Sequence, residues 1–273
     1  MPRLGFGFSE ARDAQASVTE ALARGYRSID TAAVYGNEQG VGRALAASGL
    51  RRDELFVTTK LWNVDRGHAQ ALRSADQSLQ RLGLDHVDLY LVHWPNRALD
   101  LCRQTWEAME EIYAGGRARA VGVSNFRPSH LRRILGFGGT VPAVHQIELH
   151  PHLQQRELRA VNAEHDIVTE AWSPLGRGAV LDEPVLARIA DRLGRSPAQV
   201  VLRWHLQQGT VVIPKSDSPR RIAQNRAVFD FELTDRDMLA IADLHVEGGA
   251  GRIGPVPDEV GVIPDPGRPP TRV

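Results

Sequence analysis

Short apolar segments alternate with helical patterns along almost the whole chain, and this alternation most constrains the fold. Eight segments have the length and apolar character of strands that are buried on both faces. They span residues 4–8, 26–30, 55–60, 87–93, 119–124, 143–149, 167–172 and 211–214. Between them, apolar residues recur at helical spacing, as in the series Leu72, Ala75, Leu79 and Leu82, which ends at Gly83.

Eight strand–helix units in succession are typical of a closed parallel barrel, which needs about 250 residues. We therefore predict an α/β fold in which residues 1–273 form a single (β/α)8 TIM-barrel domain, with two extra helices and an irregular tail over 246–273. The structural rival is an open, doubly wound sheet. The G-x-G of the first predicted strand, Gly5-Phe6-Gly7, has no third glycine and no strand of its own before it, so it does not support that rival.

Composition excludes several classes of function. Charged residues make up 24% of the chain and the formal net charge is zero, which argues against a nucleic-acid partner. The single cysteine, Cys102, excludes internal disulfides and fits a reducing cytoplasm. No apolar run resembles a signal peptide or a membrane span, so we expect a cytoplasmic protein without a membrane partner. We also expect a monomer. His145, His150 and His152 lack a second cluster with carboxylate or cysteine ligands, so we expect no metal.

Titratable side chains stand where three consecutive predicted strands end. These are Asp30, Lys60 and His93, and Tyr35 follows Asp30 by five residues. In α/β folds the carboxyl ends of the strands carry the chemistry. The lysine content supports this interpretation, because only two of the 33 basic residues are lysines. Both of them, Lys60 and Lys215, stand where a predicted strand ends.

Five short motifs lie at or near these strand ends. They are Asp30…Tyr35-Gly36-Asn37-Glu38, Lys60-Leu61-Trp62, Leu91-Val92-His93-Trp94-Pro95, Gly122-Val123-Ser124-Asn125-Phe126 and Ile213-Pro214-Lys215-Ser216. In this order, over roughly residues 4–245, they resemble the aldo-keto reductases, in particular bacterial members of the 2,5-diketo-gluconate reductase kind. The resemblance implies an NADPH-dependent reductase of carbonyl compounds. It also implies a catalytic tetrad of Asp30, Tyr35, Lys60 and His93.

Acid–base chemistry explains why such a reaction needs these residue types. Hydride addition to a carbonyl requires a proton donor at the oxygen, and a phenol with a pKa of about 10 is too weak an acid unless it is perturbed. A neighbouring ammonium lowers that pKa, and a carboxylate holds the ammonium in place. We therefore predict Tyr35 as the general acid, Lys60 as its activator and Asp30 as the anchor of Lys60. His93 would donate to the carbonyl oxygen and orient it.

The cofactor site is expected near the last strands of the barrel, at a helix N-terminus. The resemblance implies that the 2′-phosphate and adenine of NADPH are bound by Lys215, Ser216, Arg221, Gln224 and Asn225. It assigns the nicotinamide carboxamide to Ser124, Asn125 and Gln146, with Trp172 stacked on the ring. The residues around the pyrophosphate would be Ser173, Leu175 and Gly176.

The resemblance is weakest in the segments that surround a substrate. The loop from Ser9 to Asp13 is shorter than is usual in the family and lacks the common aromatic residue, His145 stands where asparagine is usual, and the tail after Leu244 does not match. We therefore expect a broad range of small aldehydes, α-dicarbonyls or keto-sugars. Trp62 and Trp94 are predicted as pocket walls. Arginines that could reach a substrate from loops are Arg12, Arg97, Arg177 and Arg252.

Two other kinds of function remain open. A lysine at the end of a barrel strand, beside an aspartate and a tyrosine, also suits Schiff-base chemistry of the aldolase type on Lys60. Alternatively, the chain could be a non-catalytic partner subunit that binds the cofactor as a sensor. Turnover of carbonyl substrates with NADPH would separate both alternatives from a reductase.

Overall fold

The structure, a computed structural model, describes the chain except for residues 10–12, 96–98, 259 and 261–273. Eight parallel strands form one sheet in the order β1 to β8. They are β1 Phe6–Gly7, β2 Ser28–Asp30, β3 Phe56–Leu61, β4 Leu89–Val92, β5 Val121–Ser124, β6 Val144–Glu148, β7 Val168–Trp172 and β8 Val211–Val212. The sheet closes because the Gly5 N–H donates to the Val212 carbonyl at 2.8 Å and the Val212 N–H donates to the Arg3 carbonyl at 3.1 Å. The predicted parallel barrel is confirmed.

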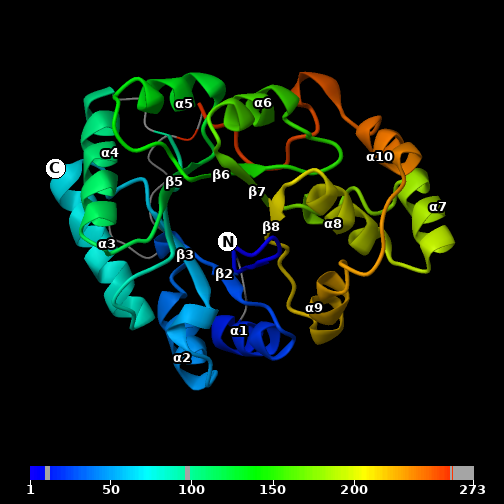
Figure 1. The fold of residues 1–273 in the computed structure, drawn as a ribbon, viewed down its shortest axis with the longest axis horizontal. Helices are drawn as coiled ribbons and strands as arrows, with labels where there is room; N and C mark the ends of the chain where they lie inside the picture. The colour runs from blue at the N-terminus through cyan, green and yellow to red at the C-terminus, as the bar shows by residue number, and fades with distance from the viewer. Residues whose placement is uncertain (10–12, 96–98, 259, 261–273) are drawn as a thin grey trace.

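The described residues contain ten α-helices, most of which return the chain from one strand to the next. They are α1 Ala14–Ala23, α2 Glu38–Ala47, α3 His68–Leu82, α4 Leu99–Ala114, α5 Pro128–Leu135, α6 Arg156–Glu164, α7 Pro184–Leu193, α8 Pro197–Gln207, α9 Pro219–Arg226 and α10 Asp235–Ala242. Two helices precede β8 and two follow it, which accounts for the two extra helices. In Figure 1, α7, α8 and α10 lie together beyond β8. They share a second apolar cluster around Trp204.

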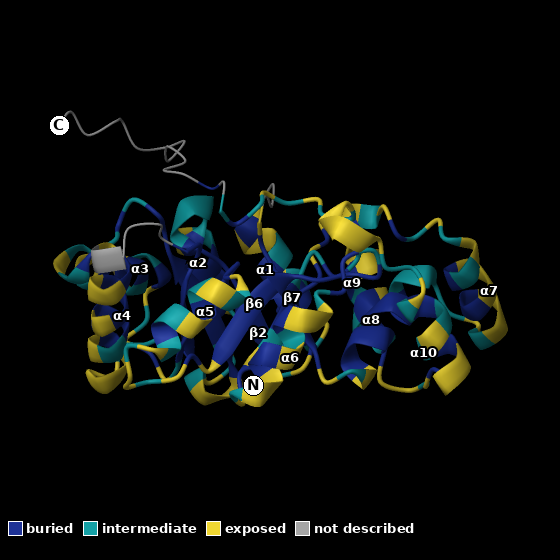
Figure 2. Ribbon diagram, turned by 90° about the horizontal axis from the view of Figure 1, so that it is seen from above, coloured by how far each residue is buried: buried dark blue, intermediate teal, exposed yellow. Residues whose placement is uncertain are grey.

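Most strand residues are buried, as the apolar sequences predict, although Val168 at the start of β7 is exposed. Figure 2 shows the strands as buried and the helices as exposed only on their outer sides. The main apolar cluster includes Phe6, Ile29, Val57 and Tyr90, which come from four successive strands. A barrel filled in this way leaves its strand ends as the place for a site.

The first and last strands are shorter than predicted. The ladder covers only two residues in each, against the predicted 4–8 and 211–214. Pro214, at the end of the last predicted strand, has no N–H to donate to a ladder, although its carbonyl accepts from the Gly7 N–H at 3.3 Å. The barrel therefore closes through few bonds at this seam.

The register brings the strand ends together. Asp30 pairs with Thr58, Leu61 with Val92, Ser124 with Gln146, and Glu148 with Trp172. Because all strands are parallel, the side chains at their carboxyl ends share one rim.

No helix in the described part of the chain is both long and apolar enough to cross a membrane. That residues 1–273 form a single domain stays a prediction.

We predict opposite effects of alanine at two glycines of helix α2. A Cβ at Gly42 would clash with the Leu82 carbonyl, where α2 packs on the end of α3, so Gly42→Ala should cost about 1–3 kcal/mol of stability. The nearest atom to a Cβ at Gly40 lies at 3.5 Å. Gly40→Ala should therefore gain about 0.5–1 kcal/mol, because alanine favours a helix. Urea unfolding measures both changes; equal midpoints would show that α2 and α3 separate freely.

Candidate active site

The predicted catalytic side chains meet at the carboxyl end of the barrel. Asp30 ends β2, Lys60 lies one residue before the end of β3, and His93 directly follows β4. Tyr35 ends a short 3-10 turn, Ala33–Tyr35, and Gly36 behind it takes a left-handed conformation with φ of 63°. The turn returns the phenol to the strand ends, so that Tyr35 lines the same cavity as Asp30 and His93.

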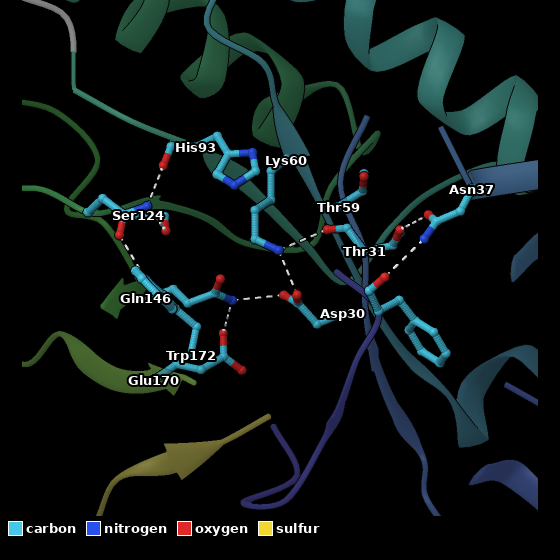
Figure 3. A network of polar contacts seen from close by, with 12 residues as sticks. Asp30, Thr31, Asn37, Thr59, Lys60, His93, Ser124, Gln146, Glu170 and Trp172 are labelled. Atoms are coloured by element: carbon cyan, nitrogen blue, oxygen red, sulfur yellow. Dashed lines mark hydrogen bonds and ion pairs between the residues drawn. The ribbon is translucent and has the colours of Figure 1, made fainter. Parts of the chain in front are cut away.

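Lys60 is the buried centre of this group. Its side chain is 0% exposed. Its Nζ donates to Asp30 Oδ1 at 2.6 Å and to the Thr31 carbonyl at 2.9 Å (Figure 3). Burial by itself lowers the pKa of Lys60. The negative charge of Asp30, and then Tyr35, raise this pKa by a larger amount, so the net shift is upward. Lys60 is therefore an ammonium at neutral pH.

The phenol of Tyr35 lies beside this ammonium. Lys60 Nζ is 5.4 Å from the centroid of the Tyr35 ring. Burial raises the pKa of Tyr35 and Lys60 lowers it, and the net direction is upward. The lowering by Lys60 that the sequence predicts is present, but burial has the larger effect on the pKa of Tyr35. Tyr35 therefore keeps its proton at neutral pH, and Lys60 reduces the cost of losing that proton.

His93 is a neutral imidazole between two aromatic rings. Its ring meets Tyr35 edge to face, with centroids 5.8 Å apart, and meets Trp62 in the same way at 5.2 Å. Burial, and secondarily Lys60, hold the pKa of His93 well below its ordinary value. The ring therefore carries one N–H at neutral pH. It is a hydrogen-bond donor that does not add a second positive charge to the site.

Asp30, Tyr35 and His93 line a cavity of about 260 Å³, whereas Lys60 is fully buried beside it. Trp62 and Trp94 form part of its wall, as predicted, and are buried at 6% and 7% exposure. They pack against Val260, and Pro255 lines the same cavity. The tail, which lies outside the five motifs named above, therefore closes one side of the site.

A second cavity, of about 920 Å³, adjoins the first and shares four lining residues with it: Ser9, Ser173, Arg177 and Lys215. All five predicted 2′-phosphate and adenine residues line it, namely Lys215, Ser216, Arg221, Gln224 and Asn225. Helix α9 starts at its edge, where the Ser218 side chain caps the helix and Pro219 follows. The structure thus brings these residues together around one cavity.

One of the predicted cofactor residues, Lys215, has a contact that the sequence does not predict. Lys215 Nζ pairs with Asp217 Oδ2 at 2.6 Å, whereas Arg221 has no ion pair among the described residues.

Of the residues predicted around the pyrophosphate, Ser173 and Leu175 line the second cavity, but Gly176 lines neither of the two cavities. Gly176 is buried with φ of 56°, and a Cβ there would approach Val180. The assignment of Gly176 to the pyrophosphate stays a prediction.

The residues predicted to bind the carboxamide line the first cavity: Ser124, Asn125, Gln146 and Trp172. Asn125 adopts a left-handed backbone with φ of 63°. Its Nδ2 donates to the His93 carbonyl at 2.9 Å and to Ser124 Oγ at 3.0 Å. Its Oδ1 accepts from Trp172 Nε1 at 2.7 Å. Asn125 therefore ties the ends of β4, β5 and β7 together.

His145 supports this turn from the next strand. Its Nε2 accepts from the Phe126 N–H at 3.1 Å, and its Nδ1 lies 2.9 Å from Asn162 Oδ1. Those partners require the neutral tautomer with the proton on Nδ1. Burial lowers the pKa of His145 to about 4, so the arrangement holds at neutral pH. A histidine at this position is thus a backbone support.

The sequence analysis missed two buried glutamates. Glu170, in the middle of β7, is 1% exposed and accepts from Gln146 Nε2 at 2.7 Å. Glu148 ends β6, as Asp30 ends β2, so the strand-end rule could have found it. Glu170 could have been found because it is an acidic residue in the middle of a predicted apolar strand, 167–172.

Glu148 binds the tail. Its carboxylate accepts from the Ile253 N–H at 2.6 Å and the Gly254 N–H at 3.0 Å, and it pairs with Arg252 at 3.3 Å. Burial by itself raises the pKa of Glu148. Hydrogen bonds from His150 and the two tail amides lower this pKa by a larger amount, so the net shift is downward. The carboxylate is therefore charged at neutral pH and anchors the segment that closes the cavity.

Other candidate groups are less informative. Within the described ranges, no three histidine, cysteine, aspartate or glutamate side chains are arranged to hold a metal ion. Of the four loop arginines, Arg177 lines both cavities and Arg252 is paired with Glu148. Arg12 and Arg97 lie outside the described residues.

Comparison with known proteins gives consistent matches over nearly the whole chain. The sequence model of the Aldo/keto reductase family matches residues 3–245. An aldo-keto reductase of Mycolicibacterium smegmatis is 50% identical, covering 94% of this chain and 93% of that protein. The methylglyoxal reductase DkgA of Yersinia pestis is 48% identical, covering 96% and 94%. A crystal structure of a Gox0644 mutant in complex with NADPH is 45% identical, with a TM-score of 0.90, covering 96% of this chain and 95% of that one.

Neutralising Glu148 should release the tail. Glu148→Gln removes the charge from hydrogen bonds worth about 1.5–3 kcal/mol, so the Ile253 and Gly254 amides should exchange with solvent about 10-fold faster or more. Hydrogen exchange followed by mass spectrometry measures this. Glu157→Gln is the matched control, because Glu157 lines the cavity beside the tail and makes no hydrogen bond to the tail residues that the structure describes. Equal exchange in both variants would contradict the anchoring role.

Proposed function

Since the chain belongs to the aldo/keto reductase family, we propose that it reduces small α-dicarbonyls and keto-sugars with Tyr35 as the general acid. It is an NADPH-dependent oxidoreductase that acts on carbonyl compounds. A monomeric state and a cytoplasmic location are part of the proposal. The observation that carries the catalytic assignment is the fully buried Lys60, bonded to Asp30 and placed beside Tyr35.

The mechanism follows from the protonation states. Tyr35 keeps its proton because burial raises its pKa, and it can donate that proton to an oxygen in the cavity. As the phenolate forms, the ammonium of Lys60 stabilises its charge, and Asp30 holds the ammonium in place. The N–H of neutral His93 orients the carbonyl oxygen toward Tyr35. When bound, NADPH supplies the hydride that adds to the carbonyl carbon.

The described residues fit NADPH. The larger cavity holds the cations Lys215 and Arg221 beside the N-terminus of α9, where free backbone N–H groups and positive charges favour a phosphate. It runs into the smaller cavity, which contains Ser124 and Gln146 as donor and acceptor for a carboxamide. Arg177, which lines both spaces, is suited to the pyrophosphate between them.

The size of the catalytic cavity supports small substrates. About 260 Å³ is below the range of about 300–1,000 Å³ that is usual for sites of drug-sized ligands. Trp62, Trp94 and Val260 give it an apolar wall. The name of one relative, methylglyoxal reductase, agrees with an α-dicarbonyl as the substrate class.

Schiff-base chemistry on Lys60 is disfavoured by the geometry. A nucleophilic amine must lose its proton, but the pKa of Lys60 is raised by Asp30 and Tyr35. Its Nζ is also buried and bonded to Asp30 and the Thr31 carbonyl. A substrate could reach it only by breaking both contacts. The non-catalytic alternative is tested by turnover itself.

Replacing the phenol tests the catalytic assignment. Tyr35→Phe should lower kcat by about 10²–10⁴, the usual contribution of a general acid, while NADPH binding is retained. The control is Tyr113→Phe, because Tyr113 is exposed on α4. Steady-state kinetics with methylglyoxal measures the effect. A wild-type protein that binds NADPH and reduces no carbonyl compound in a broad panel would instead favour the sensor function.

Cofactor preference should reside in Arg221. Its guanidinium has no ion pair among the described residues and is available to the 2′-phosphate, so Arg221→Ala should weaken NADPH binding about 10–100-fold. Binding of NADH, which has a hydroxyl there, should change little. Arg220→Ala is the matched control, because Arg220 is the neighbour on α9 that does not line the cavity. Equal losses for NADH and NADPH would mean that Arg221 only supports the helix.

A further inference from the structure

The side-chain amide of Gln146 lies between two carboxyl groups from different strands. Its Nε2 donates to Asp30 Oδ2 at 2.8 Å and to Glu170 Oε2 at 2.7 Å (Figure 3). An amide nitrogen has two N–H groups, so both are used by these two oxygens. A 180° turn of the amide would place its oxygen against the same two acceptors. The two carboxyl groups therefore fix which end of Gln146 is free.

The free end is the oxygen, and it belongs to a residue that lines the catalytic cavity. Gln146 Oε1 has no hydrogen-bond partner among the described residues. The neighbouring amide of Asn125 is already used, because its nitrogen binds the His93 carbonyl and Ser124 Oγ and its oxygen binds Trp172. Ser124 Oγ accepts from Asn125 and still has its own O–H to donate. One acceptor and one donor thus face the cavity, which is the complement of a primary carboxamide.

We propose that Glu170 is a positioning residue that holds Gln146 with its oxygen toward the cavity, where it accepts an N–H from the nicotinamide carboxamide of NADPH. This inference rests on the proposed function, because the ligand is the cofactor of the reductase. With Asp30 alone, a rotation of the Gln146 amide about its Cγ–Cδ bond would break a single hydrogen bond. Glu170 supplies the second point of attachment and so determines the orientation.

Glu170 is poorly placed for a purely structural role. It is 1% exposed, and its Oε1 has no hydrogen-bond partner. The charged groups that face it are Asp30 and Lys60. Burial, and then the charge of Asp30, raise the pKa of Glu170 to about 8. At neutral pH the acid is largely protonated and still accepts from Gln146 through Oε2, so the orientation holds without a second anion beside Asp30.

A cofactor analogue separates positioning from structure. In the 3-acetylpyridine analogue of NADPH, a methyl group replaces the NH2 of the carboxamide, so the contact with Gln146 Oε1 is lost. The wild-type protein should bind NADPH about 10-fold more tightly than the analogue, which corresponds to about 1.4 kcal/mol. In Glu170→Leu this ratio should fall toward one through weaker binding of NADPH. In Glu170→Gln it should persist, because the glutamine oxygen still accepts from Gln146.

Each outcome decides the question. If Glu170→Leu binds both cofactors less tightly by the same factor, Glu170 only supports the fold and the proposal is overturned. A wild type that binds both equally would overturn it too, while leaving the NADPH assignment intact. A wild type that binds neither would remove the proposed function itself. Glu170→Met, whose flexible side chain fills the same space, replaces the leucine variant if that protein does not fold.

The stability of Glu170→Gln provides an independent measurement. Because the pKa of Glu170 is raised from 4.5 to about 8 in the folded protein, the folded state holds a proton that the unfolded state has lost between these values. Stability therefore decreases as pH rises from 4.5 to 8. Glutamine removes this penalty, so the Tm difference between variant and wild type should grow over that interval and level off above it. A constant difference would show that Glu170 is ionised throughout and would contradict its placement beside Asp30.

Discussion

A fully buried ammonium is the constraint on which the rest of the site depends. Removing an ammonium from water costs several kcal/mol unless its protons are satisfied, and Lys60 meets this cost through Asp30 and the Thr31 carbonyl. Thr31 is in turn held by the Thr58 carbonyl at 2.9 Å and by Asn37 at 2.6 Å, and Asn37 reaches the Phe8 carbonyl at 3.2 Å. The loop that carries Tyr35 runs between these two held residues. The contacts that keep Lys60 charged therefore also place the phenol.

Charge balance around Lys60 explains the directions of the neighbouring pKa shifts. Two buried carboxyl groups, Asp30 and Glu170, face one buried ammonium, that of Lys60. Asp30 pairs directly with Lys60, so Glu170 would be an excess negative charge and keeps its proton. His93 would be an excess positive charge and stays neutral. Tyr35 also stays neutral, because its burial outweighs the attraction of its phenolate to Lys60.

The sequence predicts the barrel and the residues at its strand ends because both follow from local patterns. Strand length, helical spacing and the last residue of a strand are properties of single segments. The missed features join segments far apart in the chain: Gln146 with Glu170, Asn125 with Trp172, and Glu148 with Ile253. No local pattern says which strand end lies beside which. The effect of burial on the pKa of Tyr35 was missed for a similar reason, since it depends on how deeply the assembled barrel buries the ring.

The tail and the barrel are coupled through one aromatic ring. Glu148 and Trp172 are register partners on β6 and β7. Glu148 holds the Gly254 N–H, and a Cβ at Gly254 would clash with the Trp172 ring. The opposite end of that ring is fixed by the bond from Nε1 to Asn125. Because Trp172 also lines the catalytic cavity, a displacement of the tail at Gly254 reaches the residues predicted to hold the nicotinamide. The tail and the predicted nicotinamide residues are therefore in mechanical contact in this chain.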